Sequence, residues 1–187
     1  LMKTFQHRVK SGDAPQGTPA TDTARSSGKV GLQQLAALVS NALAEAVKKL
    51  ADLNSTERKV EYKRDVLLPQ FAEYVDRFRA EGVQHELLGY YLVWLFDAGK
   101  IESGLRMGAY CHAHAVPLPE RFKRGTGVFI TDQITDWAEA EQEAGRSVEP
   151  YFSTLFDWVQ GMCADPLDIP DKLLARVYRM RAMAYEQ

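Results

Sequence analysis

The sequence has few cysteines, no long apolar run and no secretion signal. Its two cysteines, Cys111 and Cys163, cannot build a disulfide framework and favour a reducing, intracellular compartment. No apolar run approaches the roughly 18 residues of a membrane-spanning helix, so we expect no membrane partner. Basic residues occur near the N-terminus, but the apolar core of a secretion signal is missing. These absences exclude disulfide-rich secreted proteins and integral membrane proteins.

The common motifs of catalytic sites are also missing. The sequence contains no G-x-x-x-x-G-K-[ST], no G-x-S-x-G and no H-E-x-x-H. A metal-dependent nuclease needs several convergent carboxylates, whereas the acidic residues here are concentrated in one segment, Asp132–Glu143, without a basic partner motif. We therefore expect no catalytic residues and no cofactor in this chain, and a metal-dependent nuclease is the least favoured interpretation.

The stretch AYCHAHAVPLPERFKR, residues 109–124, places one cysteine and two histidines within four residues. On a helix, His112 and His114 point about 200° apart, so they cannot share one ion. Cys111 and His114 could share one, but a structural zinc site needs four ligands. We expect a buried cysteine, two histidines at a helix end, and no metal.

The remaining pattern is helical, and it predicts an all-α protein. The chain of 187 residues is 45% hydrophobic with a net charge of −2, so any attraction to an anionic partner must come from local patches. We expect a flexible basic arm over 1–29, a helical hairpin over 30–81 and a compact bundle of short helices over 82–187. Helices are predicted over 86–96, 101–115, 131–144, 149–163 and 171–185, with a weak strand pattern at 127–130.

The arm carries five basic residues against two acidic ones. Its Gly, Ser, Thr and Pro content cannot bury enough apolar surface to offset the entropy of ordering. Two interpretations stay open, a solvated terminus and a nucleic-acid tether. The candidate DNA contacts in the arm are Lys3, Arg8, Lys10, Arg25 and Lys29.

The hairpin carries apolar residues on more than one face, including Val66 and Val75. A pair of helices cannot cover that much surface alone, so it packs on the rest of the chain or on other copies, and we favour self-association. Pro69 predicts a kink near Leu68. The candidate oligomerisation residues are Leu35, Leu38, Val39, Leu43, Leu50, Val60, Leu67, Phe71 and Phe78.

A basic loop follows the CHAH stretch. Arg121, Lys123 and Arg124 flank Phe122 and precede two glycines, a composition that suits contact with phosphate. The last predicted helix is also basic, whereas the segment around 132–149 is acidic. These two segments are either solvated helix faces or surfaces through which subunits dock.

Four segments, in this order, resemble the small terminase subunits of tailed bacteriophages, in particular those of temperate phages with cohesive ends. They are K-R-x-x-L-L-P from Lys63, W-x-x-D-x-G-x-I from Trp94, L-P-x-x-F-K-R from Leu118 and F-x-T from Phe129. The resemblance runs from about residue 57 to 181. Members of this branch commonly continue into a basic tail that strengthens DNA binding. This sequence stops at Glu186-Gln187 before such a tail, so either it is truncated or this member lacks the tail.

The resemblance implies a non-enzymatic subunit that binds the packaging (cos) site of double-stranded viral DNA in the host cytoplasm. It implies a ring of about eight to ten copies, and recruitment of a large subunit that carries the ATPase and the nuclease. The label "endonuclease subunit", frequent in this branch, then belongs to the assembled enzyme. The alternative is a tetratricopeptide-like scaffold that binds protein partners without DNA, although no 34-residue repeat supports it.

Overall fold

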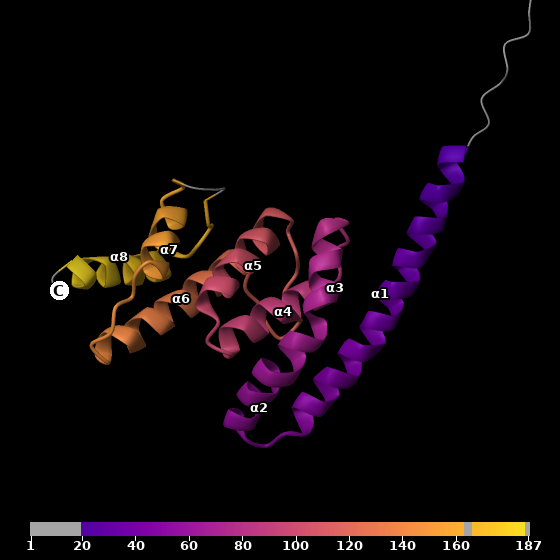
Figure 1. Ribbon diagram of the computed structural model, residues 1–187. Coiled ribbons are helices and arrows are strands. Elements are labelled where there is room, and N and C mark those ends of the chain that lie inside the picture. Colours follow the sequence, from indigo (N-terminus) through magenta and orange to yellow (C-terminus); the bar gives the residue numbers. More distant parts are fainter. Residues whose placement is uncertain (1–19, 163–165, 186–187) are drawn as a thin grey trace, which may run out of the picture. The chain divides into compact units, whose positions relative to one another are not determined.

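The computed structural model describes the backbone of residues 20–162 and 166–185, and the side chains of 31–162 and 166–183. Within these ranges the chain forms helices and no strands, which confirms the all-α class (Figure 1). The elements in chain order are α1 (Ala20–Asp52), α2 (Thr56–Tyr62), the π-helical turn η1 (Lys63–Leu67), α3 (Leu68–Ala80), α4 (Glu86–Asp97), α5 (Ile101–Ala113), α6 (Thr126–Glu143), α7 (Tyr151–Val159) and α8 (Asp171–Tyr185).

The chain divides into two units within α1, Leu1–Leu35 and Ala36–Gln187. The described part of the first unit is the beginning of α1, which starts at Ala20 rather than at the predicted Val30. The rest of the predicted arm, residues 1–19, lies outside the described residues. The second unit holds the end of α1 and all later helices.

The segment after α1 begins with a polar cap and continues through a π-helical turn. Ser55 caps α2, because its hydroxyl accepts a hydrogen bond from the Arg58 backbone N–H at 3.3 Å. The predicted irregularity before Pro69 is η1, which ends at Leu67 and leads directly into α3. Proline at the start of α3 is tolerated because the first backbone N–H groups of a helix have no partner within it.

Helix α3 packs on α4 of the same chain. Phe71 and Phe78 are fully buried, and their rings lie 5.8 Å from Trp94 and 4.8 Å from His85. His85 also lies against the middle of α1, with its Nε2 3.1 Å from the carbonyl oxygen of Ala36. The hairpin therefore covers much of its apolar surface by packing on the rest of its own chain. The sequence had left this packing and self-association as two alternatives.

Helix α4 is the buried central helix that its apolar sequence predicts, with eight of its residues buried. Gly99 follows it in the left-handed region, at φ 69°, as expected for a C-terminal glycine. Helix α5 then returns close to α4, and a Cβ added to Gly104 would lie 2.9 Å from the Phe96 ring. The small residues of α5 thus set the distance between the two helices.

Helix α6 begins earlier than predicted. It starts at Thr126, so the weak strand pattern at 127–130 is helical and neither Thr131 nor Asp132 caps the helix. Phe129, Ile130 and Ile134 are all buried, and this burial outweighs the β-propensity of Val128 and Ile130. Helices α5 and α8 both pack against α6.

Candidate nucleic-acid interface

The loop that carries the predicted basic residues joins α5 to α6 and is held against α4. Where it passes Gly89, a Cβ on that residue would lie only 2.2 Å from the carbonyl oxygen of Pro117. Gln84 donates to the carbonyl oxygen of His114 at 2.7 Å, and the Thr126 hydroxyl donates to that of Val116 at 3.1 Å. The loop is therefore fixed to the helical bundle near both of its ends.

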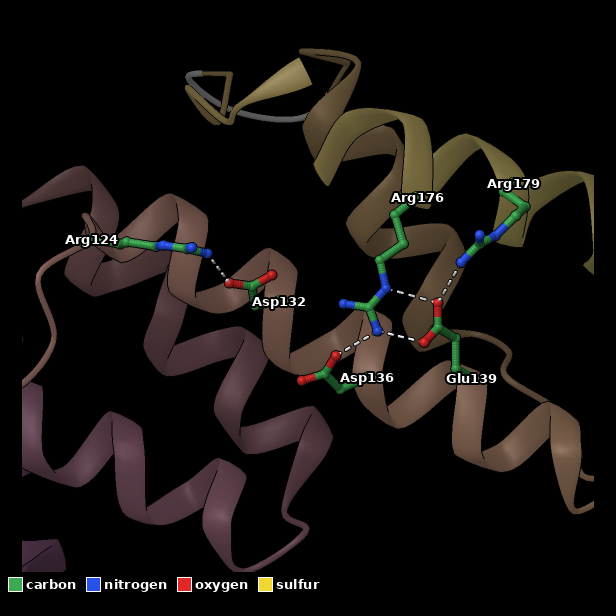
Figure 2. Close-up of polar contacts among 6 residues, drawn as sticks. All are labelled: Arg124, Asp132, Asp136, Glu139, Arg176 and Arg179. Carbon is green, nitrogen blue, oxygen red and sulfur yellow. Dashed lines mark hydrogen bonds and ion pairs between the residues drawn. The ribbon is translucent and has the colours of Figure 1, made fainter. Parts of the chain in front are cut away.

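An aromatic chain anchors the middle of the loop. The ring of Phe122 packs edge-on against Phe129 at 5.1 Å, and Phe129 packs against Phe96 of α4 at 5.8 Å. The guanidinium of Arg121 lies over the Phe122 ring, 4.9 Å from its centroid. Because Phe122 points inward, its charged neighbours remain exposed. One of them, Arg124, lies just before α6 and reaches Asp132 of that helix at 3.1 Å (Figure 2).

Helix α8 adds cations beside this loop. Arg176 bridges two carboxylates of α6, with Nη2 2.6 Å from Asp136 and Nε 2.8 Å from Glu139 (Figure 2). Arg179 also reaches Glu139, at 3.3 Å. The hydrogen bond from Arg176 outweighs the effect of burial and lowers the pKa of Glu139, while the same contact raises the pKa of Arg176.

The acidic and basic segments noted in the sequence thus meet within one chain, on neighbouring helices. A further contact joins Arg181 of α8 to Glu149, at 3.1 Å. Sequence reasoning singled out the loop cations but not Lys172, Arg176 and Arg179 as part of the same surface. The sequence does show that one segment is acidic and the other basic. This charge pattern does not tell whether the two segments pair within one subunit or between subunits.

A groove of about 770 Å³ lies where α6 and α8 face each other. Val128, Leu173 and Ala175 contribute apolar lining, and Arg124, Lys172, Arg176 and Arg179 stand along it. A second hollow, beside the first, is lined by Arg121, Lys123 and Phe122. Among the described residues no carboxylate pairs with Arg121, Lys123 or Lys172. The surface therefore combines paired arginines with exposed cations that are free to meet an anion.

The other predicted DNA contacts are not placed by the structure. Lys3, Arg8 and Lys10 lie outside the described residues. Arg25 and Lys29 fall on the backbone of α1, but their side chains are not described. Their role in DNA binding stays a prediction.

The candidate oligomerisation residues divide into two groups. Val39, Leu43, Leu67, Phe71 and Phe78 are buried within the chain and offer no surface to a second copy in this conformation. Leu35, Leu50 and Val60 are half-buried, and Leu38 is 67% exposed. Val66, noted in the sequence as lying off the main stripe, is 40% exposed. Self-association stays a prediction, with Leu38 as its most accessible apolar side chain in this region.

The CHAH stretch ends α5, as expected. Cys111 is buried, and burial raises the pKa of its thiol to about 12, which opposes the thiolate form that binds metals. The ring of His112 lies edge-on to Trp158 at 5.6 Å, and that of His114 stacks on Tyr110 at 4.1 Å. Within the described ranges, no three His, Cys, Asp or Glu side chains gather as metal ligands would.

Two of the motifs noted in the sequence touch each other. Lys63, at the start of the K-R-x-x-L-L-P segment, donates to Asp97 of the W-x-x-D-x-G segment at 2.7 Å. The Lys63 side chain is only 12% exposed. The contact ties η1 to the end of α4, so these motif residues serve the architecture of the bundle.

Comparison with known proteins gives a family model that matches residues 40–174 and is described as the phage small terminase subunit. The chain belongs to this family. The match begins within α1 and covers α2 to α7, the basic loop and the first turn of α8. It supports the packaging interpretation over the tetratricopeptide-like scaffold. No solved structure matches the chain.

Two curated relatives are both named as terminase endonuclease subunits. A "Probable terminase, endonuclease subunit" of Haemophilus phage HP1 is 30% identical over 122 residues, which is 64% of this chain and 43% of the relative. A "Terminase, endonuclease subunit" of Escherichia phage P2 is 24% identical over 143 residues, 75% of this chain and 56% of the relative. This small terminase subunit thus spans about half the length of the curated relatives it matches. None of its described helices is long and apolar enough to cross a membrane.

Proposed function

We propose that this chain binds the packaging site of double-stranded viral DNA as a ring-like homo-oligomer in the host cytoplasm. There it recruits the large subunit that carries the ATPase and the nuclease. The observation that carries the proposal is the family match over residues 40–174, which includes the exposed loop cations Arg121, Lys123 and Arg124. Phosphate contacts from such cations supply most of the affinity for DNA and make it depend on salt.

Replacing Arg121, Lys123 and Arg124 together by alanine tests the DNA contact. The matched control replaces Lys48, Arg58 and Arg106 by alanine. These residues are also exposed, and their replacement removes the same number of positive charges. Arg106 pairs with Glu102 at 3.3 Å, much as Arg124 pairs with Asp132, so each triple variant also breaks one exposed ion pair.

DNA binding is measured by fluorescence anisotropy on a cohesive-end duplex across a salt series. Losing three phosphate contacts is expected to flatten the slope of log affinity against log salt by about 3, and the control is expected to retain the slope of the parent chain. Equal slopes for the two variants would reject the loop as a DNA contact.

The arm is tested in the same way. Deleting residues 2–29 removes Lys3, Arg8, Lys10, Arg25 and Lys29 together, and it is expected to weaken DNA binding and flatten the salt slope further. If the deletion leaves the salt slope unchanged, the arm does not contact DNA. It is then a solvated terminus, the other interpretation of its composition.

The oligomer is tested by light scattering, with and without the duplex. We expect about eight to ten copies, and a shift in mass when DNA is added. Leu38→Glu places a charge on the exposed apolar side chain, whereas Gln34→Glu adds the same charge at another exposed position of α1. Dissociation by the first substitution alone supports self-association through this region; a monomer in every sample rejects the ring.

The nuclease activity that the relatives' names mention is proposed to lie in the assembled complex and not in this chain. Supporting this, Asp132, Asp136 and Glu139 each already accept from an arginine of the same chain, which leaves them poorly placed to hold a catalytic metal ion. The isolated chain, incubated with supercoiled DNA and Mg²⁺ or Mn²⁺, is expected to leave the DNA intact. Cleavage that disappears in Asp132→Asn would overturn this part of the proposal.

A further inference from the structure

The groove between α6 and α8 differs from the loop surface in having apolar lining. Leu173, which is buried, and Val128, which is half-buried, line the groove. Ala175 of α8 lines it too and is exposed. Apolar lining gives a phosphate or a sugar no hydrogen-bond partner, but it contributes free energy when it takes up an apolar side chain. At about 770 Å³ the groove lies within the range of volumes of ligand-binding pockets.

The polar groups along the groove are nearly all cations. Arg124, Lys172, Arg176 and Arg179 line it together with a single carboxylate, Asp132. Lys172 has no ion-pair partner among the described residues. Arg176 engages its acceptors through Nε and Nη2, and Figure 2 shows its remaining nitrogen on the side away from Glu139, with no contact drawn to it. The groove thus presents free donors above an apolar floor.

We propose that this groove is a docking site for an acidic peptide segment of a partner protein, one that inserts an apolar side chain between flanking carboxylates. The carboxylates would pair with Lys172 and the free nitrogen of Arg176, while the apolar side chain covers Leu173 and Val128. A DNA duplex fits this surface less well, because its outer edge consists of phosphates and its apolar thymine methyl groups lie recessed in the major groove, out of reach of the floor. This inference goes beyond the proposed DNA contact and does not depend on it.

The test is a selection of random peptides of about 12 residues, displayed on filamentous phage, against the immobilised full chain. Selected peptides are expected to be rich in Asp and Glu around a Leu, Ile or Phe. Replacing that apolar residue by serine is expected to weaken binding about tenfold, as for an anchor residue in an interface. A selection without such a consensus, or peptides that tolerate the serine, would overturn the inference.

Two matched substitutions on α8 locate the binding. Ala175→Glu puts a bulky negative group in the groove, whereas Ala182→Glu makes the same change at an exposed position of the same helix that does not line it. Ala175→Glu is expected to weaken the binding of the selected peptides at least about tenfold, and Ala182→Glu is expected to leave their binding unchanged. Equal effects would overturn the inference. So would loss of duplex binding in Ala175→Glu with unchanged peptide binding, because the groove would then be a DNA surface.

Discussion

Arg176 of α8 holds Glu139 of α6 through two guanidinium nitrogens, with Nε 2.8 Å from one carboxylate oxygen and Nη2 bonded to the other. The same guanidinium reaches Asp136, so one side chain joins α8 to two positions on α6. A planar guanidinium can make this two-pronged contact, and the ammonium of a lysine cannot.

Replacing Arg176 by alanine is therefore expected to lower the free energy of unfolding by about 1 kcal/mol, the upper end for ion pairs that remain partly solvated. Urea denaturation followed by circular dichroism measures the change. The matched control is Arg146→Ala, which removes a two-pronged contact with Glu141 close by in the chain and connects no second helix. A loss in the control as large as in Arg176→Ala would contradict the assignment of Arg176 as the link between helices.

The Glu139 contact should also make stability depend on pH. Arg176 lowers the folded-state pKa of Glu139 below its usual value of 4.5. A carboxyl with a lowered folded-state pKa adds stability above its unfolded pKa, and this stability is lost as the pH falls through the folded-state pKa. Glutamine at position 139 resembles the protonated acid. The difference in unfolding free energy between the parent chain and Glu139→Gln is expected to be largest near neutral pH and to shrink below pH 4.5; a difference independent of pH would contradict it.

Gly89 allows the basic loop to cross α4. An alanine there would place its Cβ 2.2 Å from the Pro117 carbonyl oxygen, a backbone atom that cannot rotate away. Gly89→Ala is expected to destabilise the chain by about 1–3 kcal/mol, as overpacking does. Gly31→Ala is the control, because it lies in α1 with nothing within 4 Å of the added Cβ. It should be neutral or stabilise by up to about 1 kcal/mol, and thermal unfolding compares the two.

The Lys63–Asp97 pair gives a further prediction. Asp97→Ala leaves the nearly buried ammonium of Lys63 without its partner, and the expected loss is about 1–3 kcal/mol. Replacing both residues, as Lys63→Met with Asp97→Ala, removes the charge as well and should recover part of the loss. Asp65→Ala breaks the exposed pair with Arg64 and should cost little. A double variant less stable than Asp97→Ala alone would contradict the assignment.

The helical class and most helix positions were predictable because they depend on local patterns. The apolar spacing of the hairpin, the glycine at position 99 and the solid apolar run of α4 all act over a few residues. The start of α6 was misjudged because its glycines and β-branched residues resemble a turn followed by a strand. Only the burial of Phe129 and Ile130 against other helices makes that segment helical, and such packing is not encoded locally.

The candidate site was predictable in part for the same reason. Arg121, Lys123 and Arg124 are adjacent in sequence, so their cluster could be seen directly. Arg176 and Glu139 are 37 positions apart, and their pairing follows from the packing of α8 on α6. The groove between these helices has no counterpart in any short stretch of the sequence.

The aromatic chain under the loop has a genetic consequence. Phe122 rests on Phe129, which rests on Phe96, so the position of the loop cations depends on the shape of a buried cluster. A substitution that reshapes this cluster would move the charges without removing any of them. If the loop binds DNA as proposed, a screen for altered packaging is expected to recover changes at buried aromatic positions, and suppressors of a loop mutation can arise on α4, where Phe96 is buried.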